Sequence, residues 1–599
     1  MGYLTLRSCV DDLRRVGELV EFSESVDPYL ELAAVQRRLY ESGAPAVLFT
    51  NVRNCRFPML SNLFGTECRM NYIFRDGIES VRRVIELSAD PVSLFSERFN
   101  LRSTFSLSLS SLLSFYYSRP KRVSACCASV LSCRTELSEL PQLVSWSGDG
   151  GAYITLPMVY TEDPNRVGFS SSNLGMYRVQ ISGNDYLSNV EAGLHYQIHR
   201  GIAVHHAAAI ERGESLRVNI FIGGAPAMML AAVMPLPEGT SELFFAGILG
   251  RRRVPMCGDF GIYAEADFCI CGKLGSKMKR EGAFGDHLGY YSLEHEFPVL
   301  EVESVWCRRD AIFPFTVVGR PPQEDTQFGR FIHNLVRGVV PRKIRGVSAI
   351  HAVDEAGVHP LLLAVGRESY VPFDRKKRAA ELHTLAHAIL GYGQLSLAKY
   401  LFIASRDDDP ALDVYDIPKF LIHILRRVDW RRDVHFVTRT NADTLDYSGY
   451  FDGELSRGSK MFVAASGEPV RELSDSIDVV IPCRNPRVVM SGILCVEEIF
   501  DLKNLCTSDF PEGFPLIVIV DDSAEASSSL RNFLWTTFTK SDPASDVYGV
   551  GEFSYNKHWG CNGALIIDAK RKVHHAPELV ESPEIKTRAD NIVQKINNR

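Results

Sequence analysis

The C-terminal part of the chain repeats one pattern of strand, acidic loop, helix and aspartate-bearing turn. Two segments follow it, "KYLFIASRDDDPALDVYDIPKFLIHILRRVDWRRDV" and "FPLIVIVDDSAEASSSLRNFLWTTFTKSDPASDV". Four aspartates recur at an offset of 113 positions: Asp408, Asp409, Asp429 and Asp433 precede Asp521, Asp522, Asp542 and Asp546. Because self-similarity of this kind indicates a repeated structural unit, we expect a duplicated α/β unit. Lys460 occurs only in the first copy, since the second has Gly563 at the matching position.

The spacing of apolar residues changes twice along the chain. Residues 1 to about 115 combine helical spacing, as in "CVDDLRRVGELVEF" and "GIESVRRVIELSAD", with short strands such as "PAVLFTNV". Beyond a linker, "SLSLSSLLSFYYSRPKR", strand patterns prevail to about residue 325, among them "RVNIFIGGAP", "EADFCICGKL" and "FPVLEVESVWC". Helix and strand patterns then alternate again, which is typical of an α/β domain with a parallel sheet.

These patterns predict a multi-domain fold of α/β and β type with four parts. We expect an N-terminal α/β domain at 1–118, a mainly β domain of barrel type at 119–325, an α/β domain at 326–470, and a C-terminal extension at 471–599 with the second copy of the repeat. A chain of 599 residues is long enough for several domains, each with its own core.

Composition and charge argue against several classes of protein. The chain has 66 basic and 73 acidic residues, a net charge of −7, and no basic block of the kind that binds nucleic acid. The sequence contains no run of eighteen apolar residues, so it predicts no transmembrane segment. The N-terminal "MGYLTLRSCVDDLRRVGELVEF" has charged pairs where a signal peptide has an apolar core. We therefore expect a cytoplasmic protein.

The fourteen cysteines lack the regular spacing of a secreted disulfide framework. Cys269 and Cys271 form a C-x-C in a strand-like run, so both side chains should point to the same face. Core packing is favoured over a metal or redox role for this pair, because a buried free cysteine behaves as a small hydrophobe.

Polar residues that could carry chemistry gather in about 115 residues of the β-rich region. They are Asn173, Gly175, Tyr177 and Arg178 in "SSNLGMYRVQ", His195 and His199 in "LHYQIHRG", Glu242 in "GTSELFFAG", and Glu281 and Asp286 in "REGAFGDHLGYY". Taken singly, such residues are more often caps, core histidines or solvated carboxylates. Together, an amide, an imidazole and a carboxylate form a ligand set suited to Mn²⁺ or Mg²⁺ beside a phosphate. An arginine with two carboxylates could hold a substrate carboxylate and move a proton.

Six short motifs together resemble those of the UbiD decarboxylases, the 3-polyprenyl-4-hydroxybenzoate carboxy-lyase family that uses prenylated FMN. They are "NLGMYR", "HYQIHRG", "PLPEGTSELFFAG", "EGAFGDHLGYY", "VVGRPP" and "GSKM". The resemblance runs from the first residues to about 470. It implies an N-terminal α/β domain, a central split β-barrel that binds the flavin, and a C-terminal α/β domain for oligomerisation, and hence a homo-oligomer.

The resemblance also implies roles for individual residues. Asn173, His195 and Glu242 would hold the metal that ties the cofactor phosphate to the protein, with His199 as the alternative histidine. The cofactor would be lined by Met176, Tyr177, Arg178, Tyr196, Gln197, Arg200 and Gly201, and Lys460 would reach it from the C-terminal domain. Arg178, Glu281 and Asp286 would form the catalytic group, with Asp286 as proton donor. We expect burial near another carboxylate to raise the pKa of Asp286. Ala283 stands where many members have proline, which should loosen the turn slightly.

The function implied is non-oxidative decarboxylation of an aromatic acid of the hydroxybenzoate or hydroxynaphthoate type, in ubiquinone or menaquinone biosynthesis. The cofactors would be prenylated FMN, supplied by a flavin prenyltransferase, and Mn²⁺, with K⁺ as an optional second ion. A prenylated substrate would bring transient membrane contact. Two alternatives remain: a decarboxylase of acrylic or cinnamic acids or a reversible carboxylase, and a flavin-binding structural subunit without turnover.

Overall fold

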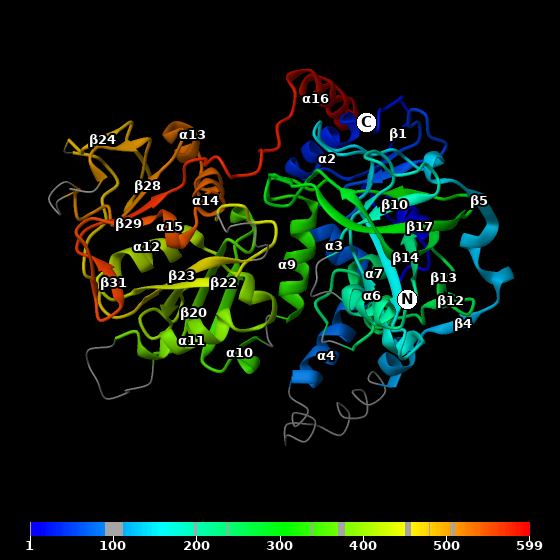
Figure 1. Ribbon diagram of the computed structural model, residues 1–599, viewed down its shortest axis with the longest axis horizontal. Helices are drawn as coiled ribbons and strands as arrows, with labels where there is room; N and C mark the ends of the chain where they lie inside the picture. Colours follow the sequence, from blue (N-terminus) through cyan, green and yellow to red (C-terminus); the bar gives the residue numbers. More distant parts are fainter. Residues whose placement is uncertain are drawn as a thin grey trace. The chain divides into compact units, whose positions relative to one another are not determined.

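A computed structural model gives the fold (Figure 1) and describes residues 2–89, 112–196, 201–236, 239–336, 340–368, 378–449, 457–478, 480–502, 505 and 510–598. The chain forms two compact units. The first comprises Met1–Gly319, Gln323–Val336 and Glu578–Arg599, and the second comprises Arg320–Pro322 and Arg337–Pro577. The segment that follows residue 470 is therefore divided between the two units. Within the described parts of the chain, every helix is too short or too polar to cross a membrane.

The N-terminal part of the first unit is a small α/β layer. Its helices are α1 (Leu6–Arg15), α2 (Glu31–Glu41), α3 (Glu67–Phe74) and α4 (Ile78–Ala89). Its sheet has the order β1 (Leu19–Phe22), β2 (Ala46–Phe49), β3 (Met59–Ser61) and β18 (Phe313–Pro314). Because β18 lies more than 250 residues further along the chain and pairs with β3 in parallel, the N-terminal layer and the central region share one sheet.

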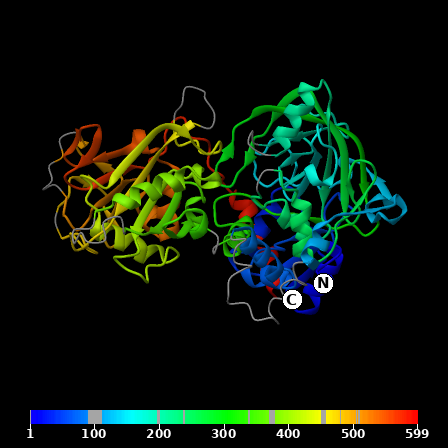
Figure 2. The ribbon, with the colours of Figure 1, turned by 90° about the horizontal axis from the view of Figure 1, so that it is seen from below.

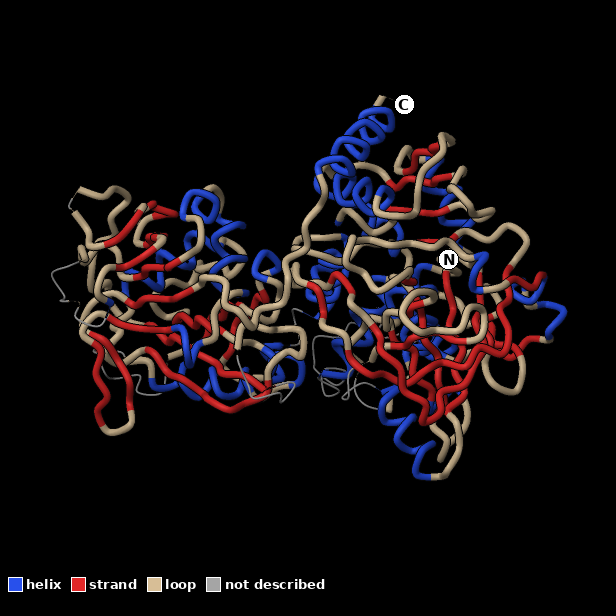
Figure 3. The backbone as a smooth tube through the Cα atoms, turned by 45° about the horizontal axis from the view of Figure 1, so that its top comes forward, coloured by secondary structure: helices blue, strands red, loops and turns tan. Residues whose placement is uncertain are grey.

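A nine-stranded sheet, among the red strands of Figure 3, forms the centre of the first unit. Its order is β6 (Tyr153–Ile154), β9 (Val179–Gln180), β10 (Glu191–Leu194), β17 (His295–Cys307), β14 (Phe268–Glu281), β11 (Leu216–Ile222), β7 (Pro157–Glu162) and β8 (Ser172–Gly175), with β5 (Cys133–Thr135) also on β17. The helices here are α6 (Gly201–Glu211), α7 (Pro226–Ala231), α8 (Glu242–Gly250) and α9 (Glu324–Val336). The sulfur atoms of Cys269 and Cys271 lie 3.6 Å apart and Cys269 is fully buried, so the pair shares one face as predicted.

Two smaller sheets complete the first unit. One has the order β13 (Ile262–Tyr263), β12 (Pro255–Cys257) and β4 (Lys121–Val123). The other is a hairpin of β15 (Phe284–Gly285) and β16 (Tyr291–Ser292), and it contains the turn with Asp286. Glu281, the last residue of β14, comes shortly before this hairpin in the sequence and pairs with His295 of β17.

The second unit contains two five-stranded sheets with the same strand order and directions. The first has the order β19 (Val347–Ala352), β20 (Leu361–Gly366), β21 (Tyr400–Ser405), β23 (Arg457–Ala465) and β22 (Val434–Asn441). The second has the order β25 (Arg487–Met490), β26 (Ile493–Val496), β28 (Leu516–Ile519), β32 (Leu565–Asp568) and β29 (Val547–Gly549). In each, the three middle strands are parallel and both edge strands are antiparallel to their neighbours.

The aspartates of the sequence repeat make matching contacts in the two halves. The amide of Asp429 donates to Oδ2 of Asp433 at 2.8 Å, and the amide of Asp542 donates to Oδ2 of Asp546 at 2.7 Å. The remaining helices are α10 (Val340–Lys343), α11 (Ala380–Leu390), α12 (Ile417–Arg427), α13 (Ser523–Ser527), α14 (Leu530–Thr539) and α15 (Pro543–Asp546). Two short pairs join β24 (Cys483–Arg484) to β27 (Glu498–Ile499) and β30 (Glu552–Tyr555) to β31 (His558–Cys561).

Beyond the second unit the chain returns to the first and forms α16 (Pro583–Asn597), which lies beside α2 in Figures 1 and 2. Ala589 and Ile596 of this helix are buried in the same core as Leu32 and Val35 of α2. The last helix of the sequence, α16, is therefore part of the same hydrophobic core as α2, which lies near the start of the chain.

Candidate active site

Arg178 lies at the centre of a buried cluster in the first unit. It sits between β8 and β9, and its side chain is 9% exposed. Its Nε and Nη2 donate to the two carboxylate oxygens of Glu281 at 2.9 and 2.8 Å, and its Nη1 donates to Oδ2 of Asp286 at 2.6 Å. The guanidinium also lies 4.8 Å from the ring centre of Phe284. One arginine thus holds both carboxylates of the "EGAFGD" turn.

The turn that carries the two carboxylates is held by hydrogen bonds from two segments, one around Asn184 and one at Asp149 and Gly150. Asn184 Nδ2 donates to the carbonyl of Gly282 at 2.7 Å, and the amide of Gly150 donates to the carbonyl of Ala283 at 2.7 Å. Oδ1 of Asp149 accepts from the amide of Gly285 at 2.8 Å. Sequence reasoning missed Asp149, although its place between two glycines in "SGDGG" is the kind of signal that marks a structured turn.

The charges of the cluster favour ionised carboxylates. Burial would raise the pKa of Glu281, but the charge of Arg178 and hydrogen bonds from His195 and Arg178 lower it to about 2. Burial acts in the same upward direction on Asp286, but a hydrogen bond from His287 and the charge of Arg178 leave its pKa below the ordinary value. The predicted upward shift of the pKa of Asp286 is therefore wrong, because the hydrogen bond from His287 and the charge of Arg178 together outweigh the effect of burial.

His195 belongs to the same cluster. Its Nδ1 lies 3.0 Å from Nη2 of Arg178 and 3.1 Å from Oε2 of Glu281, and its ring lies 4.2 Å from that of Phe297. Burial, and then the charge of Arg178, lower its pKa, which favours the neutral imidazole. A neutral ring with one nitrogen fixed by a carboxylate is the form in which histidine binds metals.

Asn173 and Glu242 lie together where β8 meets the start of α8. Oε2 of Glu242 accepts from the amide of Leu174 at 2.8 Å, and Oγ of Ser172 lies 2.8 Å from Oγ of Ser241, which caps α8. Burial outweighs the hydrogen bond from the amide of Leu174 and raises the pKa of Glu242 to about 7. A cation at this carboxylate would offset the cost of its burial.

Aromatic residues and a glycine surround this position. The rings of Tyr177 and Tyr196 are 6.5 Å apart, and the hydroxyl of Tyr196 lies 2.5 Å from Nδ1 of His206, a contact that sequence reasoning did not foresee. A Cβ at Gly201 would lie 2.2 Å from Oδ1 of Asn173, so only glycine leaves that amide in place. Met176 binds the carbonyl of Ala232 through its amide. The predicted Gln197, His199 and Arg200 lie outside the described residues.

Lys460 lies on β23 of the second unit, where it is buried. Its Nζ donates to the backbone carbonyls of Ala398 at 3.3 Å and Asn441 at 2.7 Å and to that of Ser396. Burial lowers its pKa to about 8. Its predicted approach to the cofactor stays a prediction.

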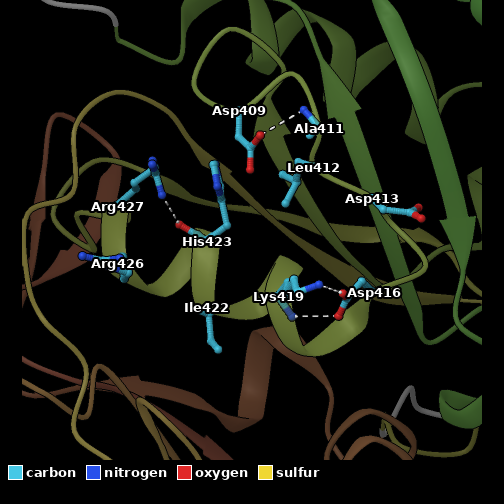
Figure 4. A pocket seen from close by; sticks show the side chains of 10 residues that line it. All are labelled: Asp409, Ala411, Leu412, Asp413, Asp416, Lys419, Ile422, His423, Arg426 and Arg427. Carbon is cyan, nitrogen blue, oxygen red and sulfur yellow. Dashed lines mark hydrogen bonds and ion pairs between the residues drawn. The ribbon is translucent and has the colours of Figure 1, made fainter.

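A cavity of about 450 Å³ lies in the second unit, between the loop after β21 and α12 (Figure 4). Charged side chains of both signs line it, among them Asp409, Asp416, Lys419 and Arg427. None of the predicted site residues is among its lining residues. The polar cluster around Arg178 is therefore the stronger candidate for chemistry.

Three family models match the chain in sequence order. They describe the N-terminal, Rift-related and C-terminal domains of UbiD, 3-octaprenyl-4-hydroxybenzoate carboxy-lyase, and match residues 10–88, 120–321 and 326–465. Arg178, Glu281 and Asp286 all lie in the Rift-related match.

Relatives extend over nearly the whole chain. An uncharacterised protein of Chlamydia trachomatis is 35% identical over 97% of both chains. A protein of Chlamydia pneumoniae, named as a subunit of 4-hydroxybenzoate decarboxylase, is 34% identical over 97% of this chain and 96% of its own.

Solved structures share the fold. The UbiD-class enzyme HmfF of Pelotomaculum thermopropionicum, in complex with FMN, matches with a TM-score of 0.60 and 21% identity, over 79% of this chain and 97% of its own. Vanillic acid decarboxylase of Sedimentibacter hydroxybenzoicus matches with a TM-score of 0.61 and 19% identity, over 80% of this chain and 96% of its own.

Proposed function

The chain belongs to the UbiD family of carboxy-lyases, and we propose that it decarboxylates an aromatic acid of the hydroxybenzoate or hydroxynaphthoate type with prenylated FMN as cofactor. The observation that carries the proposal is the buried contact of Arg178 with both Glu281 and Asp286. This contact supports a cationic site for the substrate carboxylate beside a group that would carry the proton.

The reaction explains why a cofactor is needed. Loss of CO₂ from an aromatic carbon leaves an electron pair in the plane of the ring, where it cannot delocalise, and side chains offer no electron sink for it. When bound, prenylated FMN supplies that sink. The protein's own contribution is to orient the acid, to keep water out and to return a proton to the carbon.

Arg178 would bind the substrate carboxylate, and Glu281 would keep the guanidinium in place. With a pKa of about 2, Glu281 stays ionised throughout the neutral range and so fixes the charge of its partner. Asp286 would donate the proton. Since the charge of Arg178 is one cause of the low pKa of Asp286, a second anion at that guanidinium would raise this pKa and allow Asp286 to take up a proton from solvent.

The residues around Glu242 fit a divalent metal beside the flavin phosphate. The donor set would be the amide oxygen of Asn173, the carboxylate of Glu242 and Nε2 of His195, a mixture of oxygen and nitrogen that suits Mn²⁺. Two observations support this assignment: the raised pKa of the buried Glu242, which a cation would reverse, and the carboxylate contact at Nδ1 of His195. Gly201, packed against Asn173, leaves no room for a larger residue there.

The name of the Chlamydia pneumoniae relative supports a hydroxybenzoate substrate, and with it a place in quinone biosynthesis. The fold neighbours named for vanillic acid and 3,4-dihydroxybenzoic acid also act on hydroxylated benzoic acids. By the family resemblance we also propose a homo-oligomer in the cytoplasm that receives its cofactor from a flavin prenyltransferase.

The deciding experiment is co-expression of the chain with a flavin prenyltransferase in the presence of manganese. The released cofactor is identified by mass and absorbance, and the loaded protein is assayed for CO₂ release from hydroxybenzoates and hydroxynaphthoates. Prenylated FMN at about one per chain with turnover of one of these acids is expected. A folded protein that binds no flavin would refute the proposal.

A further inference from the structure

The segment that precedes α16, residues 578–582, contacts the turn that carries Asp286. The amide of Leu579 donates to the carbonyl of Gly289 at 3.0 Å, and Glu578 forms an antiparallel bridge with Tyr290. Within the turn, the amide of Asp286 donates to the carbonyl of Tyr290 at 2.9 Å. The returning segment is thus one hydrogen bond away from the backbone of Asp286.

Two residues later, Glu581 binds the basic face of α2. Its Oε1 accepts from Nη2 of Arg37 at 2.6 Å, and its Oε2 accepts from Nη2 of Arg38 at 2.8 Å. The side chains are between 11% and 20% exposed, so the contact is largely shielded from solvent. Charged hydrogen bonds of this kind fix position more strongly than neutral ones.

Arg37 also contacts an aromatic residue, Trp146. Its guanidinium lies 4.0 Å from the ring centre of Trp146. Trp146 is 6% exposed, and its indole Nε1 donates to the carbonyl of Val318 at 2.9 Å. A cation over a buried indole is a favourable and directional contact, so the position of Arg37 bears on the position of Trp146.

Trp146 in turn packs on the catalytic turn. A Cβ at Gly285 would lie 2.1 Å from Cδ1 of Trp146, which shows that the indole lies directly on the backbone of Gly285. The amide of Trp146 donates to Oδ2 of Asp149, whose Oδ1 accepts from Gly285. Gly285 immediately precedes Asp286.

We propose that residues 578–582 and α16 brace the turn with Asp286, through Leu579 on one side and through Glu581, Arg37 and Trp146 on the other. Glu581 and Arg37 are positioning residues, because Glu581 binds Arg37 and Arg37 acts through its contact with Trp146. The effect of the brace on catalysis rests on the proposed function. Its effect on the position of the turn does not.

Hydrogen exchange in the full-length chain tests the brace without any turnover. Glu581→Gln removes the charge that Arg37 and Arg38 bind and keeps the shape of the side chain. Lys595→Gln is the matched control, because it removes an ion pair between α16 and Glu24, in which the side chains of Lys595 and Glu24 are 55% and 45% exposed. We expect the amides of Gly285, Asp286 and Leu579 to exchange about tenfold faster in Glu581→Gln, the effect of losing one charged hydrogen bond, and to be unchanged in Lys595→Gln.

A second variant separates bracing from general instability. Arg37→Lys keeps a cation for Glu581 and loses the planar group over Trp146, so the same amides should exchange faster while those of α16 do not. If exchange rises equally across the nine-stranded sheet in both variants, Glu581 and Arg37 only stabilise the first unit, and the proposal is overturned. Unchanged exchange in the turn overturns it as well.

Kinetics of the flavin-loaded protein test whether the brace affects catalysis. In Glu581→Gln we expect kcat to fall about tenfold with KM and flavin content unchanged, because a displaced Asp286 impairs proton transfer more than binding. An unchanged kcat beside faster local exchange would overturn the positioning role. A wild-type protein that releases no CO₂ from any acid would refute the proposed function, and the exchange experiment would still decide whether the brace exists.

Discussion

Nη1 of Arg178 lies 2.6 Å from Oδ2 of Asp286. The predicted proton donor is therefore bound to the same guanidinium that would receive the substrate carboxylate. In the proposed function, an acid that enters would compete with Asp286 for Arg178, and this competition would link binding of the substrate to protonation of the donor.

Asp286→Asn should abolish turnover and leave the flavin bound. The amide keeps the size of the side chain but has no acidic proton, and loss of a general acid typically slows a reaction by about 10²–10⁴-fold. CO₂ release and the absorbance of bound cofactor measure the two effects. Glu294→Gln, at an exposed carboxylate further along the chain, is the control. Normal turnover in Asp286→Asn would sink the assignment of the proton donor.

Glu242→Gln should remove the effect of manganese on stability. Metal at about 100 times its Kd stabilises a protein by about 2.7 kcal/mol, and the wild-type thermal midpoint should rise accordingly. Because the pKa of Glu242 is about 7 without metal, the rise should be larger at pH 8 than at pH 6, where protons compete with the ion. An equal rise in Glu242→Gln and the wild type would show that the metal binds elsewhere.

Gly201→Ala should lower the flavin and metal content without loss of stability. The added Cβ would displace Oδ1 of Asn173, whereas alanine is a better helix former than glycine. Gly329→Ala in α9 is the matched control, since nothing lies within 4 Å of the added Cβ there. Cofactor content by absorbance and the thermal midpoint are the two measurements. Full cofactor content in Gly201→Ala would contradict the placement of Asn173 in the site.

Glu324→Gln should change how stability depends on pH. Burial raises the pKa of Glu324 to about 7, so the folded state keeps a proton that the unfolded state releases above its ordinary pKa. The wild type therefore loses about 3 kcal/mol of unfolding free energy between about pH 4.5 and 7, and the variant does not. The glutamine can still accept from the amide of Phe64, as the carboxylate does. Urea unfolding across this range tests the difference, and parallel curves would contradict it.

The sequence motifs predicted which residues belong to the site, and the structure shows the contacts between them. Arg178 and Asp286 lie more than a hundred positions apart, yet they are within hydrogen-bond distance. Arg178 directly precedes β9, and pairing of β9 with β10, of β10 with β17 and of β17 with β14 places it at the sheet that contains Glu281. Their catalytic roles stay predictions. The direction of the pKa shift of Asp286 could not be predicted, because it depends on whether the hydrogen bond from His287 and the charge of Arg178 outweigh burial, and spacing along the chain does not give those contacts.

The partner of α16 could not be predicted either. Helical spacing of Ile585, Ala589, Ile592 and Ile596 indicates an apolar face, but nothing in that pattern names the surface that covers it. The sequence patterns predicted one C-terminal extension over all of residues 471–599, with the second α/β copy. In the structure the apolar face of α16 packs in the same core as α2, and Glu581, just before α16, forms ion pairs with Arg37 and Arg38, which leave no periodic signal in the sequence.

The distance along the chain between Arg38 and Glu581, 543 residues, matters during synthesis on the ribosome. At about 5–20 residues per second, roughly half a minute to two minutes pass between the emergence of α2 and that of its partner. Throughout that time the nascent chain exposes the apolar and basic face that α16 later covers, while the whole second unit is being made. The unit that is begun first is therefore the last to be completed, and chaperones that shield exposed apolar surface have their longest opportunity to act at α2.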